Sequence, residues 1–158
     1  LIANDALALS VLITDNYNMD TSEVAMKLFA MGDMYVAQKK YSEALRIYDS
    51  IYNQFQNHSL NDDILFRKSQ VFKIKQMQDK AIDALKQLEE EFPGSIILDK
   101  ALFSIAKLYE EDLNDFESAK KYYRKILFDH PSSLYVIDAR KRFRKLSGKT
   151  NQNINKNS

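Results

Sequence analysis

Residues 99–131, DKALFSIAKLYEEDLNDFESAKKYYRKILFDHP, decide the fold of this chain. Apolar residues recur in this segment at helical spacing, which predicts two amphipathic helices joined by a tight turn. Most of the rest of the chain consists of earlier or later versions of the same unit. The segment therefore predicts an array of helical hairpins.

The units repeat with a period of 37 residues, and the second helices repeat in the same way with one extra residue in the last turn. A fixed period between 20 and 50 residues is typical of solenoids. Pro93 and Pro131 close the second and third units, and Gln56 takes that place in the first. The repeated columns are Leu28, Leu65 and Leu102; Phe29, Phe66 and Phe103; Gly32, Ser69 and Ala106; Tyr35, Phe72 and Tyr109; Ala44, Ala81 and Ala119; Tyr48, Leu85 and Tyr123.

Each column has a physical role in a stacked hairpin. The small residue in the middle of the first helix lets the second helix approach closely, and the Ala column does the same from the other side. The aromatic residue three positions after the small one fills the gap between hairpins. Proline cannot continue a helix, so the chain turns there. One hairpin cannot bury its apolar faces alone, and stacking produces a continuous core.

These columns resemble the tetratricopeptide repeat. In unit one the pattern is Leu28, Gly32, Tyr35, Ala44 and Tyr48, and unit three repeats it and adds Pro131. The resemblance is strong over residues 25–131. Three features depart from the family: Trp is absent, Lys68 and Ser69 stand where apolar and small residues are usual, and the period exceeds the roughly 34 residues that are common. Longer repeats of this kind resemble those of bacterial cell-envelope proteins, such as outer-membrane assembly lipoproteins and periplasmic Tol-system factors.

Composition supports an all-α fold. The 158 residues include only three Gly and two Pro, too few for the many turns of an all-β fold, and 45% are hydrophobic. Cys is absent, which excludes disulfides and Cys-ligated zinc. A net charge of +1 gives no general attraction to nucleic acid, and no apolar run is long enough for a transmembrane segment.

The resemblance and the repeats together predict a right-handed superhelix of about eight helices. The expected divisions are residues 1–20, an N-terminal helix from an upstream repeat; 21–58, 59–95 and 96–131, three repeat units; 132–148, a capping helix; and 149–158, a disordered tail.

Both flanks of the array carry further expectations. A helix predicted for residues 3–14 is apolar on nearly all sides, so an upstream repeat or a second copy of the chain is expected to cover it. The chain is interpreted as the C-terminal part of a longer bacterial protein. The final helix is predicted to be capped by Ser132 or Ser133, to end at Gly148 and to carry one basic face between Arg140 and Lys145.

No constellation of residues indicates catalysis, a metal or a cofactor. His58 and His130 each stand alone at a helix end, where a metal site needs clustered ligands. The carboxylate runs at residues 89–91 and 110–112 are typical of a solvated helix face. Phosphate-binding loops need glycines that this sequence lacks. The basic run could contact phosphates or anionic lipid, but a solvated capping helix explains it more simply.

The column of Phe29, Phe66 and Phe103 is the candidate binding surface. In tetratricopeptide repeats the first helices line a concave groove, and the resemblance places the column and the neighbouring positions 36, 33, 70, 107, 73 and 110 in it. The column could instead fill space between first helices. The candidate partner-binding residues are Phe29, Phe66, Phe103, Asp33, Gln70, Lys107, Lys73 and Glu110. The Lys and Asn set with which some family members clamp a peptide C-terminus is not reproduced.

The predicted function is a non-catalytic scaffold that binds a partner protein or peptide, with self-association through the N-terminal helix as a further expectation. The alternative is a regulatory or assembly module of a larger envelope lipoprotein or enzyme whose activity lies outside this sequence. The composition speaks against nucleic acid as the partner. The sequence leaves the compartment open, with the bacterial envelope or periplasm preferred to the cytoplasm by resemblance alone.

Overall fold

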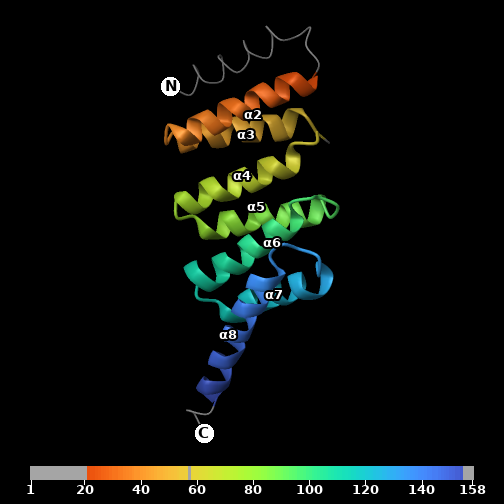
Figure 1. Cartoon of the computed structure of the whole chain (residues 1–158). Coiled ribbons are helices and arrows are strands. Elements are labelled where there is room, and N and C mark those ends of the chain that lie inside the picture. The colour runs from red at the N-terminus through yellow and green to blue at the C-terminus, as the bar shows by residue number, and fades with distance from the viewer. Residues whose placement is uncertain (1–20, 57, 155–158) are drawn as a thin grey trace. The chain divides into compact units, whose positions relative to one another are not determined.

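The computed structural model describes residues 21–56 and 58–154. This part of the chain is all-α, as predicted, and contains seven α-helices, one π-helical turn and no strand (Figure 1). The helix predicted for residues 3–14 lies outside the described residues, as does any self-association through it. The helices are α2 (Thr21–Ala37), α3 (Tyr41–Gln54), α4 (Asn61–Ile74), α5 (Gln78–Glu91), α6 (Leu98–Lys107), α7 (Phe116–Asp129) and α8 (Val136–Ile154), and the π turn η1 (Leu108–Asp112) follows α6 directly.

The chain divides into two compact units, the first unit (Leu1–Val71) and the second unit (Phe72–Ser158), which differ from the three sequence repeats. Within the first unit, α2 packs against α3. Within the second, α6 packs against both α5 and α7, and α7 packs against α8. Each contact joins neighbouring helices connected by a short turn, which is the packing expected of helical hairpins.

The core of the first unit depends on a close approach between α2 and α3. Gly32 lies opposite the Tyr48 ring, and a Cβ built at Gly32 would be 2.5 Å from its Cε1 atom. Tyr48 itself is fully buried, together with Leu28, Ala44 and Ile51. The second helix therefore approaches the first closely at the small residue, as predicted, and any larger residue at position 32 would compete with Tyr48 for the same space.

The turns inside the hairpins share one conformation. Lys39, Gln76 and Asn114 have φ angles of 59°, 57° and 54°, in the left-handed region. Each lies two residues beyond the end of its hairpin's first helix or π turn, where a left-handed residue ends a helix. None of the three is glycine, so the sequence offered no direct signal for this geometry.

The π turn η1 accommodates the extra residue of the third sequence repeat. In the first two hairpins, the N–H groups of Lys40 and Met77 donate to carbonyls five residues earlier, at Tyr35 and Phe72. In the third, the N–H of Asp115 donates to the carbonyl of Tyr109, six residues earlier. A π turn is a helical turn widened by one residue. The insertion therefore lies before the turn, at the end of the first helix of the hairpin, and α7 keeps its register.

The last helix differs from the prediction at its C-terminal end. It was expected to end at Gly148, but α8 continues to Ile154, so residues 149–154 of the predicted disordered tail are helical, and residues 155–158 lie outside the described residues. A glycine that ends a helix takes a positive φ, and no glycine among the described residues does so. Gly148 is therefore an interior helical residue.

Helix α8 is buried on one side and carries exposed cations on another. Ala139 and Leu146 are buried. Arg140 and Arg144 stand 38 residues after Leu102 and Ala106 of the preceding repeat. Both arginines are exposed. Long cationic side chains therefore stand at α8 positions that an apolar and a small residue occupy in the preceding repeat.

Two glycine substitutions test the close approach. Gly32→Ala should destabilise the protein by about 1–3 kcal/mol despite the higher helix propensity of Ala, because the added Cβ would overlap the fully buried Tyr48 ring. Gly148→Ala is the matched control. It has no atom within 4 Å of its added Cβ and should be neutral or stabilise by up to about 1 kcal/mol. Urea unfolding followed by circular dichroism measures both, and equal effects would contradict the packing described.

Candidate functional site

Asp33 is the centre of a charged network in the first unit. Its carboxylate accepts a hydrogen bond of 2.5 Å from the Tyr48 hydroxyl and forms an ion pair of 3.3 Å with Arg67. The Arg67 guanidinium also lies 5.9 Å from the centre of the Phe29 ring and donates to the Gln70 side chain. The network joins α2, α3 and α4 and fixes the groups around Phe29.

The second unit has an equivalent network centred on Glu110, in the π turn. Its carboxylate accepts hydrogen bonds from the Tyr123 hydroxyl at 2.6 Å and from Arg142 at 2.8 Å, and Arg142 also pairs with Glu111 at 2.8 Å. Both networks pair a Tyr on a second helix with an Arg 19 residues later. The acids, however, stand at different repeat positions, and Glu110 occupies its place within the widened turn.

The networks shift the pKa values of their members. Burial of Glu110 alone would raise its pKa, but the hydrogen bonds from Tyr123 and Arg142 outweigh that effect and lower it. Burial, followed by the bond to a carboxylate, raises the pKa of both tyrosine hydroxyls, Tyr48 and Tyr123. Glu110 is therefore held as a carboxylate, and both tyrosines are held as hydrogen-bond donors.

The predicted aromatic column is unequally accessible. Phe66 is only 6% exposed and belongs to the core. Phe29 is half-buried against Tyr48, with ring centres 5.9 Å apart. Phe103 is half-buried between Tyr123 and Tyr135, and it stacks on Tyr135 with ring centres 4.9 Å apart. All three rings therefore contribute to packing, and only Phe29 and Phe103 retain a surface that a partner could contact.

The remaining predicted residues carry surface charge or polarity. Gln70 and Lys73 are exposed on α4, and Lys107 is half-exposed near the end of α6. Lys73 pairs with Asp112 at 3.4 Å, and Lys107 pairs with Glu111 at 3.5 Å. In the second unit the structure thus brings Lys73 and Lys107 next to η1, the turn that contains Glu110.

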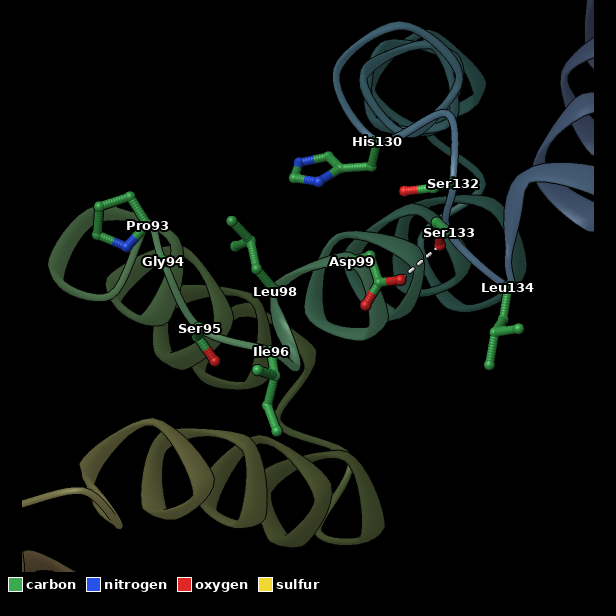
Figure 2. Close-up of a pocket in the computed structure, with 10 residues that line it drawn as sticks. All are labelled: Pro93, Gly94, Ser95, Ile96, Leu98, Asp99, His130, Ser132, Ser133 and Leu134. Atoms are coloured by element: carbon green, nitrogen blue, oxygen red, sulfur yellow. Dashed lines mark hydrogen bonds between the residues drawn. The ribbon is translucent and has the colours of Figure 1, made fainter.

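A polar pocket of about 310 Å³ lies between two turns of the second unit, one connecting α5 to α6 and the other connecting α7 to α8 (Figure 2). Asp99 and Ser133 meet in it, with 2.5 Å between carboxylate and hydroxyl oxygens. Figure 2 shows Ile96 and Leu134 on either side of this pair. Their exposed fractions are 95% and 93%, among the highest of any apolar side chain in the described residues.

Sequence reasoning missed the arginines of both networks and the role of the turn residues. The recurring Tyr–Arg spacing of 19 residues was the available signal. Ser133 does cap the turn before α8, since its hydroxyl accepts the Tyr135 N–H. Ser95 does the same for Ile97, and in the first unit His58 takes this role by accepting the Leu60 N–H at its Nδ1 atom. His58 is thus a turn-capping residue.

Across residues 21–56 and 58–154, no three His, Asp or Glu side chains gather in a way that could hold a metal ion. None of the helices in those two ranges is long and apolar enough to cross a membrane.

The two tyrosines provide a matched test of the networks. Tyr123→Phe should destabilise the protein by about 1–2 kcal/mol, because it removes a charge-assisted hydrogen bond to a side chain that is only 10% exposed. Tyr48→Phe should cost less than about 1 kcal/mol, because water can replace the lost bond at Asp33, which is 36% exposed. Urea midpoints of both variants measure the difference, and the reverse order would contradict the networks' proposed energetics.

Glu110 should make stability depend on pH. Because its pKa is lowered in the folded state, its contribution is present above its ordinary pKa, near 4.5, and is lost as pH falls through the lower folded value. Between pH 6 and 3 the wild-type protein should therefore lose more unfolding free energy than Glu110→Gln. Glu117→Gln, at a carboxylate that is 74% exposed, is the control and should retain the wild-type slope. A Glu110→Gln slope equal to that of the wild type would rule out this role.

Comparison with known proteins supports the fold. The tetratricopeptide repeat profile matches residues 28–58, 63–95 and 100–133. Similar solved structures include the Sgt2 TPR domain from Aspergillus fumigatus, with a TM-score of 0.61 and 17% identity over 83% of this chain and 82% of that one. The first TPR of Spaghetti (RPAP3), bound to the HSP90 peptide SRMEEVD, has a TM-score of 0.61 and 21% identity over 82% and 94% of the two chains.

The TPR2AB domain of yeast Sti1, solved in complex with pHSP90, has a TM-score of 0.66 and 19% identity over 81% of this chain and 49% of that one. Among curated proteins, no sequence matches this chain significantly. Identities of this size show the fold and leave the ligand open. The three profile matches span most of the chain, and they coincide with the helical hairpins described above; the chain belongs to the tetratricopeptide repeat family.

Proposed function

We propose that this chain is a non-catalytic scaffold that binds a partner protein or peptide through side chains of its first helices. The observation that carries the proposal is the pairing of a partly accessible aromatic ring with a fixed charged network in each unit: Phe29 beside Asp33 and Arg67, and Phe103 on the helix that leads into Glu110. Aromatic anchors with polar neighbours already held in place reduce the entropy lost on binding.

The relatives agree with this class of function. The Spaghetti (RPAP3) domain was solved with an HSP90 peptide and the Sti1 domain with pHSP90. The identity of the partner and the use of a concave groove are proposals for this chain. Phe66 contributes to the core, so the accessible contact set that we propose comprises Phe29, Phe103, Asp33, Gln70, Lys73, Lys107 and Glu110. The narrower predictions, a bacterial cell-envelope protein and a module of a larger lipoprotein or enzyme, stay predictions.

Charge reversal of an exposed first-helix residue tests the proposal without disturbing the core. The purified chain is immobilised, incubated with lysate of its source cells and cross-linked, and the retained protein is identified and then purified for titration. Lys107→Glu should weaken its binding at least tenfold, because Lys107 lies within the proposed contact set.

Lys121→Glu is the matched control, since Lys121 is an exposed lysine on the second helix α7. It should bind as tightly as wild type, and circular dichroism should show both variants folded. Equal binding by wild type, Lys107→Glu and Lys121→Glu would move the binding surface away from the first helices.

A further inference from the structure

We propose that the pocket between the α5–α6 and α7–α8 turns is a second docking site, which binds a partner segment carrying an aliphatic side chain next to a Lys or Arg. The site lies on the turns and uses none of the first-helix residues assigned above.

Ile96 and Leu134 are not required by the turns that carry them. The three turns between repeats have the same backbone hydrogen bonds: His58, Ser95 and Ser133 each donate an N–H to the carbonyl three residues earlier, and Asn61, Leu98 and Val136 do the same to the capping residue. The position after the capping residue is Ser59 in the first turn, where it is exposed, and Ile96 and Leu134 in the other two. A serine therefore suits this turn, so the two aliphatic residues need another explanation.

The two aliphatic side chains border a preformed pocket. They are 95% and 93% exposed, so they make almost no contact within the protein. Between them the Asp99 carboxylate is held by the Ser133 hydroxyl at 2.5 Å (Figure 2). It also accepts the Lys100 N–H at 2.8 Å. A single exposed aliphatic residue is ordinary on a protein surface, but two at one turn position on the borders of one pocket indicate an apolar contact site.

The charge of the pocket selects the partner. Asp99 is the only acidic residue among those that line it, and no Lys or Arg is among them. Asp129, the last residue of α7, and Asp138, in the first turn of α8, are exposed. A peptide with a Lys or Arg beside its apolar residue would satisfy both kinds of lining group, because the Asp99 carboxylate can pair with the cation and the aliphatic side chains offer apolar contact.

Selection from a random peptide library tests this chemistry without assuming a sequence. Phage displaying random twelve-residue peptides are selected on the immobilised chain, with the soluble double variant Ile96→Ser/Leu134→Ser as competitor. This variant places the residue of the first turn, Ser59, in both other turns, so we expect it to fold. Enriched peptides should combine an aliphatic residue with an adjacent Lys or Arg.

Fluorescence anisotropy of the enriched peptides then measures affinity. Ile96→Ser/Leu134→Ser and Asp99→Asn should each weaken binding at least tenfold. Ile74→Ser is the control, since Ile74 is also an exposed aliphatic residue, at 52%, but lies outside the pocket; it should bind as wild type does. The charge-reversed first-helix variant Lys107→Glu should also bind as wild type, which separates this site from the proposed scaffold surface.

Three results would overturn the proposal: no enriched peptide family, enrichment of acidic peptides, or equal binding by the double variant. Sedimentation with phosphatidylcholine–phosphatidylglycerol vesicles provides a further test. If the wild type sediments and Ile96→Ser/Leu134→Ser does not, the two aliphatic residues contact a membrane and the peptide assignment is wrong.

Discussion

The contact between Gly32 and the Tyr48 ring is the constraint on which the first unit depends. Because position 32 has no Cβ, the ring can lie directly against α2 and be completely buried. That placement brings the Tyr48 hydroxyl to Asp33, and Asp33 in turn holds Arg67 above Phe29. A packing requirement in the core is thereby transmitted to the groups that face solvent, and the polar surface around Phe29 becomes ordered at little additional entropic cost.

The second unit reaches the same arrangement by a different backbone route. Position 107, equivalent to Asp33 in the repeat, is a lysine and cannot accept the hydroxyl of Tyr123. The extra residue widens the end of the first helix into η1, and Glu110 accepts hydrogen bonds from Tyr123 and Arg142 in its place. π turns are frequent at functional sites. Here the turn preserves an acid–tyrosine–arginine network even though the acid has changed position.

The described surfaces separate two kinds of exposed residue. On the first helices, the Phe29 and Phe103 rings pack against Tyr48 and Tyr123, so substituting either ring would change the stability of the fold as well as any contact with a partner. On the turns, Ile96 and Leu134 contribute almost nothing to packing, and Ser59 shows that the turn forms without them. Residues that the fold does not require are the clearest evidence of a selective pressure other than stability.

By itself, the sequence determined the all-α architecture of helical hairpins and the repeated columns of small and apolar residues, because apolar spacing reports directly on helix faces. The eight candidate residues lie on first helices or, for Glu110, in the π turn that extends one. The sequence did not indicate how accessible each of them is. Only the tertiary structure decided that Phe66 is buried, that Glu110 replaces Asp33 as the acceptor, that Gly148 continues a helix and that Asp99 meets Ser133. Each of these depends on which groups from distant parts of the chain become neighbours, and on the conformation of one or two turn residues, which local periodicity does not encode.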